Sequence, residues 1–443
     1  MAPENSFASK RESKPELIQK GLSVRLFSLT LRGWITPADA FLQFFANQEN
    51  SFWLDRQHNR TDSFSVVGAG VPTGDLTLSS YQDQELPFSW RPGLVGLYEY
   101  EGQARFLSVD RAMVFDHKNR KVYLVGLFAD ENKFQDWCNA AFLRMGLIGG
   151  ELAVYRHRNL LEGKVRSVKL RHDANRYKQM IKTAQQHIAA GDVYQICLTN
   201  QIEIEHNLDP LAVFLKLREK NPAPYAAFLK MGDTAVVCSS PEQFLSVSSS
   251  GEITTKPIKG TRPRDSDKDI DEANAKELQT NDKERAENLM IVDLMRNDLG
   301  RVAKIDSIRV PVLFEIESYA TVHQLVSTVA ADLADGESAF TAVAAAFPGG
   351  SMTGAPKSRA IEIINDLESG SRGVYSGAVG YFGFNGAADF GMTIRTLVFK
   401  GSIATIGIGG GITIDSDPAA ELEETKLKAK ALLAVINAPD PWA

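Results

Sequence analysis

Residues 407–425 read GIGGGITIDSDPAAELEET and join two kinds of secondary structure. The glycine-rich segment from Ser402 to Thr413 is also rich in β-forming residues and predicts a strand. Asp417 suits a helix N-cap and Pro418 the first helical position, which predicts a helix from Pro418 to Asn437. Other predicted strands and helices alternate without a regular βαβ rhythm. The pattern therefore favours an α+β fold over a doubly wound sheet.

Further elements are expected upstream of this segment. Helical spacing predicts helices at 176–190 and 271–299, the second with a fresh start at Asn281. Residues 352–367 predict a glycine-bearing turn that leads into another helix. Strands are expected at 63–67, 121–125 and 192–204, and a strand pair at 225–247. The glycines of Gly93–Tyr98 predict a turn between strands, with close approach of backbone or ligand as the alternative. Residues 163–175 are charged and are expected to be irregular.

The chain is expected to divide into a disordered tail at 1–18, a β-rich subdomain at 19–162 and a second subdomain at 163–443. Of its 443 residues, 44% are hydrophobic and 23% charged, which is typical of soluble globular proteins. A net charge of −6 without a basic run argues against nucleic-acid binding. No apolar stretch is long enough for a membrane span. The three cysteines, Cys138, Cys197 and Cys238, form no CxxC pair, so neither a zinc site nor disulfides are expected. So few cysteines are typical of the reducing cytoplasm, which is the expected location.

Two Glu-x-x-Glu pairs, Glu284 with Glu287 and Glu421 with Glu424, each place two carboxylates on one helix face. Two such faces brought together would offer the oxygen ligands that Mg²⁺ prefers. Glu287 also precedes the apolar run 289–295, which is typical of a buried helix. A carboxylate at the edge of such a helix needs a partner, and a metal or an arginine would serve.

Simpler roles for the same glutamates remain open. Asn281 followed by Glu284 resembles a capping box. Glu424 and Lys428 are spaced for an ion pair within one helix. From the spacing alone, these alternatives are favoured over a metal site.

Glycines and isolated charges provide further candidates. Residues 349–357 (GGSMTGAPK) lead into a helix N-terminus, a natural anion site, and 408–412 (IGGGI) offer a second set of backbone amides. Arg395 is a charge in a β-rich stretch, where an ion pair and a ligand contact are equally plausible. His323 lies on a predicted apolar strand and is more typical of a satisfied core residue than of a catalyst.

Nine stretches, in order from about residue 190, resemble the chorismate-utilising family that includes component I of anthranilate synthase and of aminodeoxychorismate synthase. They are GDVYQICLTN, SSPEQF, KPIKGTRPR, KERAENLMIVDLMRNDLGR, YATVHQLVS, GGSMTGAPKSRAIEII, GVYSGAVGYFG, MTIRT and GIGGGITIDSDPAAELEET. NSFWLDR and GLVGLYEY match more loosely. The resemblance implies an anthranilate synthase component I-like fold, with two layered antiparallel sheets flanked by helices, and a catalytic role for residues 163–443.

The resemblance also implies roles for single residues. Mg²⁺ would be held by Glu287 and Glu424, with Glu284 and Glu421 in support. The remaining assignments are Glu242 as general acid and base, His323 facing the substrate ring, and, around the substrate chorismate, Thr261, Tyr375, Arg395, Gly409, Gly410 and Gly411.

Position 259 separates members of the family. The anthranilate synthases resemble PIAGT there, and the aminodeoxychorismate synthases resemble PIKGT. This chain has Lys259, which implies a covalent lysine intermediate on the way from chorismate and ammonia to 4-amino-4-deoxychorismate, in p-aminobenzoate and folate biosynthesis. The attack requires a neutral amine, which burial or nearby positive charge favours. Lys256, Arg262 and Arg264 flank the position and could supply that charge.

Two departures and one absence qualify the resemblance. Cys197 replaces a residue that is often asparagine. Residues 53–56 (WLDR) stand where tryptophan-inhibited members carry Leu-Leu-Glu-Ser, which argues against such inhibition. No glutaminase-like GxCxG surrounds a cysteine, so a separate glutamine amidotransferase subunit is expected to supply ammonia. The alternatives are an anthranilate or isochorismate synthase, or a non-catalytic regulatory subunit.

Overall fold

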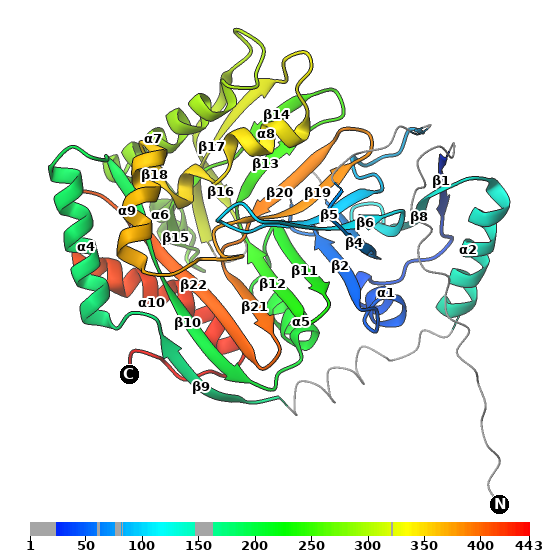
Figure 1. Ribbon diagram of the computed structural model, residues 1–443, viewed down its shortest axis with the longest axis horizontal. Helices are drawn as coiled ribbons and strands as arrows, with labels where there is room; N and C mark the ends of the chain where they lie inside the picture. The colour runs from blue at the N-terminus through cyan, green and yellow to red at the C-terminus, as the bar shows by residue number, and fades with distance from the viewer. Residues whose placement is uncertain (1–23, 60–62, 76–80, 82, 147–162, 320–321) are drawn as a thin grey trace, which may run out of the picture.

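The protein, represented by a computed structural model, is described over residues 24–59, 63–75, 81, 83–146, 163–319 and 322–443. The tail expected at 1–18 lies outside these residues. Two antiparallel sheets with helices packed on them make up the described part (Figure 1), which confirms the α+β prediction.

The first sheet has twelve strands among the described residues. Their order is β1 (Arg25–Thr30), β8 (Lys121–Phe128), β7 (Arg111–Asp116), β3 (Phe64–Ala69), β2 (Asn50–Asp55), β11 (Tyr225–Met231), β12 (Thr234–Ser240), β21 (Thr396–Lys400), β22 (Ile403–Ile412), β10 (Gln195–His206) and β18 (Gly354–Ala355), and β9 (Val165–Leu170) pairs with β10.

The second sheet has ten described strands. Their order is β15 (Ile258–Pro263), β17 (Val322–Asp332), β14 (Glu252–Thr255), β13 (Gln243–Val247), β20 (Ala388–Met392), β19 (Ala378–Gly383), β5 (Gly93–Tyr98), β6 (Ala104–Val109) and β4 (Val71–Thr73), and β16 (Arg309–Ser318) pairs with β17.

Apolar side chains from alternate strand positions fill three layers. One layer, with Phe52 and Leu97, lies between the sheets. A second packs the first sheet against α1 (Pro37–Phe44), α2 (Glu131–Met145), α5 (Pro210–Lys220) and α10 (Pro418–Val435). A third packs the second sheet against α7 (Asp282–Leu299) and α8 (Ala339–Ala346), beside which lies α6 (Lys268–Thr280). Helices α4 (Ala174–Ala189) and α9 (Lys357–Glu368) cover β10.

Local capping explains where the helices of the glutamate pairs begin. The Asn281 side chain accepts a hydrogen bond from the Glu284 backbone N–H at 3.1 Å and caps α7. Asp417 caps α10 in the same way, and Pro418 is its first residue. Both helix starts confirm the sequence prediction.

Two local predictions were wrong. Residues 163–175 are not irregular, because β9 lies among them and pairs with β10. Gly93–Tyr98 is not a turn but strand β5. A Cβ atom at Gly93 or Gly96 would lie 2.1 Å from a carbonyl oxygen of the neighbouring strand, Phe382 or Arg105 respectively. Close backbone approach, the alternative interpretation, is therefore the reason for these glycines.

Both sheets cross the expected subdomain boundary at residue 162. Strand β2 pairs with β11, with Trp53 opposite Phe228. Strand β5 pairs with β19. The division into 19–162 and 163–443 stays a prediction, but the two parts share continuous hydrogen-bonded sheets.

Candidate active site

Lys259 lies on β15, opposite Leu325 of β17. The bulge that follows it contains Gly260, whose φ of +79° favours glycine. A Cβ atom placed on Gly411 would lie 3.4 Å from Lys259 Nζ. The amine therefore reaches from the second sheet to the glycine-rich strand β22 of the first sheet.

The two glutamate pairs approach this amine from α7 and α10. Burial raises the pKa of Glu287 and of Glu421. Burial acts in the same direction on Glu424, but the Lys428 ammonium 2.8 Å away brings the pKa of that carboxyl below its ordinary value. The charge of Lys259 lowers the pKa of both Glu287 and Glu424, so the lysine lies near both pairs.

Each of the four carboxylates has a partner within the protein. The contacts are Glu284 with Arg262 at 3.4 Å, Glu287 with Lys283 at 3.9 Å, Glu421 with the Ser416 hydroxyl at 2.7 Å and Glu424 with Lys428 at 2.8 Å. The expected ion pair within α10 is therefore present. Within the described ranges, no three His, Cys, Asp or Glu side chains lie close enough to hold a metal ion. The donors are nevertheless of the type that suits Mg²⁺, carboxylate oxygens presented by two helices.

Glu242 follows β12 and is buried. Burial raises its pKa to about 7, although a hydrogen bond from Ser351 and the charges of Lys259 and Arg395 act in the opposite direction. A small cavity adjoins the carboxyl group, and Gln243, Thr255, Ser351 and apolar side chains such as Met392 line it with Glu242. A carboxyl group with this pKa can both donate and accept a proton at neutral pH.

Arg395 lies on the short link between β20 and β21 and is half-buried. Burial lowers the pKa of its guanidinium, and the nearby Glu242 carboxylate opposes the shift. Its φ of +50° is unusual for a residue with a side chain. Such backbone strain is typical of functional sites, where the surroundings hold a side chain in place.

The glycines of β22 present backbone groups to the site along the strand edge that faces away from β10. The Gly409 carbonyl accepts a hydrogen bond from Lys428 Nζ at 2.8 Å, so it faces away from β10. In an antiparallel ladder the N–H and C=O of one residue point to the same side of the strand, and residues two apart point alike. The N–H groups of Gly409 and Gly411 therefore also point away from β10. Tyr375 packs on Gly407 so closely that a Cβ atom there would lie 2.0 Å from its ring. Gly410 lies beside the Glu421 carboxylate.

Two predicted site residues lie apart from this group. His323 is buried, with Nδ1 2.7 Å from the Ser318 hydroxyl and Nε2 2.9 Å from an Asp271 oxygen. With both ring nitrogens engaged, it has the contacts of a satisfied core histidine. Thr261 is exposed and pairs with Gln324 beyond the bulge.

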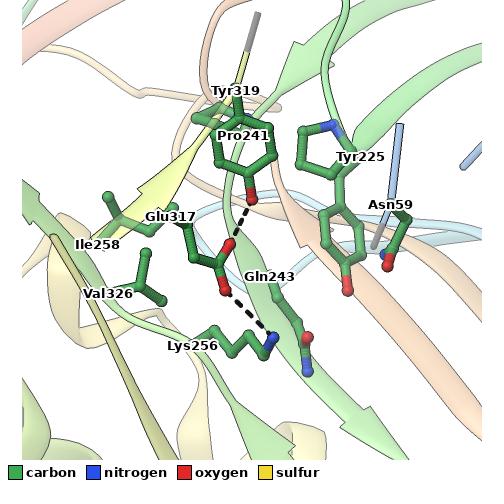
Figure 2. Close-up of a pocket in the computed structure, with 10 residues that line it drawn as sticks. Asn59, Tyr225, Pro241, Gln243, Lys256, Ile258, Glu317, Tyr319 and Val326 are labelled. Atoms are coloured by element: carbon green, nitrogen blue, oxygen red, sulfur yellow. Dashed lines mark hydrogen bonds and ion pairs between the residues drawn. The ribbon is translucent and has the colours of Figure 1, made fainter. Parts of the chain in front are cut away.

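The cations that flank Lys259 are all paired. Lys256 lies in a separate cleft with Ile258, where Glu317 bridges its Nζ at 3.5 Å and the Tyr319 hydroxyl at 2.5 Å (Figure 2). Arg262 pairs with Glu277 and Glu284, and Arg264 with Asp271. Their positive charge at the lysine is therefore largely offset, contrary to the expectation from sequence.

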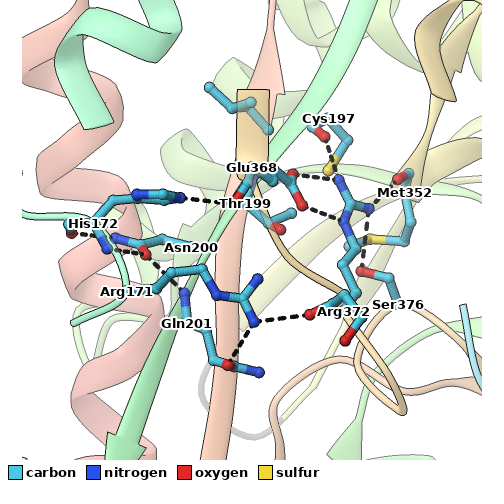
Figure 3. A network of polar contacts seen from close by, with 12 residues as sticks. Arg171, His172, Cys197, Thr199, Asn200, Gln201, Met352, Glu368, Arg372 and Ser376 are labelled. Atoms are coloured by element: carbon cyan, nitrogen blue, oxygen red, sulfur yellow. Dashed lines mark hydrogen bonds and ion pairs between the residues drawn. The ribbon is translucent and has the colours of Figure 1, made fainter. Parts of the chain in front are cut away.

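A buried ion pair joins Arg372 and Glu368 (Figure 3). Arg372 lies 2.6 Å from Glu368 and donates to the carbonyls of Cys197 and Met352 at 2.8 and 2.7 Å. Glu368 accepts a hydrogen bond from the Thr199 backbone N–H at 2.7 Å. The pair thereby joins α9, β10 and the glycine-rich turn.

Sequence reasoning missed two residues of the site. Ser351 donates to Glu242. Gln195 is the polar residue at the start of β10, and its amide lies against Gly411. Both stand in stretches that carry the family resemblance, but nothing in their spacing indicates their contacts.

A model of the chorismate binding enzyme family matches residues 77–434. The chain belongs to this family. It is 45% identical over 377 residues to aminodeoxychorismate synthase of Streptomyces griseus, covering 81% of this chain and 52% of the relative. The chain thus spans about half the length of that protein.

Other relatives have different names. Aminodeoxychorismate synthase component 1 of Bacillus subtilis is 39% identical, covering 74% of this chain and 69% of that protein. Anthranilate synthase component 1 of Streptomyces coelicolor is 36% identical, covering 91% and 87%. Among solved structures, anthranilate synthase component I of Streptococcus pneumoniae superposes with a TM-score of 0.71 at 27% identity, covering 96% of this chain and 95% of that one. The predicted fold is therefore confirmed. No described helix is long and apolar enough to cross a membrane.

Proposed function

We propose that the protein aminates chorismate to 4-amino-4-deoxychorismate, using ammonia and releasing water. One observation carries the proposal: the Lys259 amine lies against Gly411, near the glutamates of α7 and α10. The names of the Streptomyces griseus and Bacillus subtilis relatives support the choice of product.

Chorismate would enter with its carboxylates facing cationic and amide donors. Arg395 and the outward N–H groups of Gly409 and Gly411 are the donors available for them. Tyr375 forms the wall beside β22. Mg²⁺ held by Glu287 and Glu424 would draw electrons from the diene as a Lewis acid when bound.

Lys259 would start the reaction. Its neutral amine attacks the ring carbon next to the carboxylate-bearing carbon, the double bonds shift, and the bond from carbon 4 to the hydroxyl breaks. Protonated Glu242 supplies the proton that lets this hydroxyl leave as water. The new secondary ammonium can then return a proton to the Glu242 carboxylate.

Ammonia completes the exchange. It attacks carbon 4, the double bonds shift back and the bond from Nζ to the ring breaks. Nζ leaves with the electron pair of that bond and takes a proton from protonated Glu242, so it departs as the neutral amine. The surplus proton on the new amino group then returns to the Glu242 carboxylate. Chorismate and ammonia thereby give 4-amino-4-deoxychorismate and water, and the enolpyruvyl group is retained.

We place this reaction in p-aminobenzoate synthesis for folate, in the cytoplasm, with a later lyase step to remove the enolpyruvyl group. The ammonia would come from a glutamine amidotransferase subunit. The designation "component 1" of the Bacillus subtilis relative supports such a partner.

A product assay tests the proposal. The protein is incubated with chorismate, MgCl₂ and an ammonium salt, and the products are separated by chromatography. We expect 4-amino-4-deoxychorismate; anthranilate would instead establish the second candidate function, which the Streptomyces coelicolor relative favours. Isochorismate, or no turnover at all, would likewise refute the proposal.

Two matched variants test the lysine. Lys259→Ala should abolish amination. Lys256→Ala, which removes a lysine three positions away that pairs with Glu317, should retain it. Full turnover in Lys259→Ala would disprove the covalent role.

A further inference from the structure

Gln195 has a buried side chain whose amide oxygen lacks a hydrogen-bond partner among the described residues. Only 2% of the residue is exposed, and Oε1 forms no hydrogen bond within the part of the chain that the structure describes. A buried amide oxygen without a donor is unfavourable. No described donor of the neighbouring α9, α10 or β18 reaches Oε1, so this buried oxygen has an unused capacity to accept a hydrogen bond.

The amide nitrogen of Gln195 lies on the side of Gly411 and Lys259. A Cβ atom on Gly411 would lie 2.7 Å from Gln195 Nε2 and 3.4 Å from Lys259 Nζ. Both side chains thus converge on the space that the missing side chain of Gly411 leaves free. Rotating the amide by half a turn exchanges its oxygen and nitrogen and brings the acceptor to the side of Nζ.

The other groups around Lys259 indicate why a neutral hydrogen-bond acceptor would matter there. The charge of Lys259 acts to lower the pKa of Glu242, Glu287 and Glu424, so all three carboxyl groups lie near the amine. A carboxylate beside an amine favours the protonated form, which cannot attack carbon. A neutral amide oxygen can accept an N–H with much less preference for that form.

We propose that Gln195 is a positioning residue for Lys259: its amide oxygen accepts a hydrogen bond from Nζ and directs the lone pair of the amine toward the ring. The inference rests on the proposed role of Lys259 as nucleophile. The same oxygen accepts a hydrogen bond from the secondary ammonium that forms on attack.

The test compares Gln195→Met, which keeps length without an acceptor, with Gln201→Met on the same strand. Mixing enzyme, MgCl₂ and chorismate, then quenching in acid, gives the rate of lysine adduct formation by intact-protein mass spectrometry. We expect Gln195→Met to slow adduct formation by about tenfold, the effect of one hydrogen bond to a charged group. The affinity for chorismate and the KM for ammonium should stay unchanged, and Gln201→Met should behave as the wild type.

Two results would overturn the inference. One is a normal rate of adduct formation in Gln195→Met. The other is a raised KM for ammonium with a normal adduct rate, which would assign the glutamine to ammonia instead. If Gln195→Met does not fold, Gln195→Asn withdraws the amide by one methylene and must show the same slow adduct formation. Absence of an adduct in the wild type, with full turnover in Lys259→Ala, would refute the role of Lys259 as nucleophile, whereas a product other than 4-amino-4-deoxychorismate would refute the proposed function itself.

Discussion

Replacing Glu242 by glutamine should make the protein inactive and, at alkaline pH, more stable. The pKa of Glu242 is raised from 4.5 to about 7 by burial. At pH 7 the carboxyl group is then about half protonated, whereas at the ordinary value about 0.3% would be, so burial increases the acid form about 150-fold. Loss of this general acid should lower kcat by about 10²–10⁴.

The same shift predicts how stability depends on pH. A carboxyl group whose pKa is higher in the folded state contributes stability below its unfolded pKa, near 4.5, and that contribution is lost as pH rises through about 7. A difference of about 2.5 units corresponds to about 3 kcal/mol. The substituted amide cannot ionise, so Glu242→Gln should unfold at higher urea than the wild type at pH 8 and lose this advantage toward pH 5.

Urea unfolding in EDTA at pH 5, 6, 7 and 8 measures the difference. The gap between Glu242→Gln and the wild type should widen by about 2–3 kcal/mol over this range. Glu203→Gln, at an exposed position of β10, is the control and should show a constant difference. A gap for Glu242→Gln that does not change with pH would refute the argument, as would a variant that keeps full activity.

Three further substitutions test other parts of the site. Gly411→Ala puts a methyl group 2.7 Å from Gln195 Nε2. We expect kcat/KM to fall by about tenfold or more, while the unfolding free energy changes little. An unchanged kcat/KM would contradict the position of Gly411 in the active site. Glu287→Gln removes a partly buried carboxylate and should weaken Mg²⁺ binding, measured by calorimetry, by about tenfold or more. Equal affinity would exclude Glu287 as a ligand. Arg372→Met leaves the buried Glu368 carboxylate without its ion-pair partner and should lower the free energy of unfolding, measured in urea, by about 3–5 kcal/mol. A decrease below about 1 kcal/mol would show that the ion pair does not stabilise the fold.

Elements whose signals are local could be predicted from the sequence. Asn281 and Asp417 mark the starts of α7 and α10, because a cap and the first turn of a helix lie next to each other in the chain. The two glutamate pairs follow from the same helices. Their approach to Lys259 does not, because it depends on how the two sheets pack.

Features that depend on distant partners could not be predicted. Residues 163–175 look irregular, yet β9 forms because β10 offers it an edge. The engagement of both nitrogens of His323 requires Asp271, 52 positions earlier. Nothing in the sequence marks Gln195, because its unusual property is that its buried Oε1 has no hydrogen-bond donor among the described residues.

The pairing of β2 with β11 has a consequence for synthesis on the ribosome. Trp53 and Phe228 lie opposite each other but are 175 positions apart (228 minus 53). At about 5–20 residues per second, β2 waits roughly 9–35 s for its neighbour to emerge. During that time a nascent chain presents an unprotected β edge to other chains. Slow translation or crowding should therefore make aggregation of newly made protein more severe than its final stability would suggest.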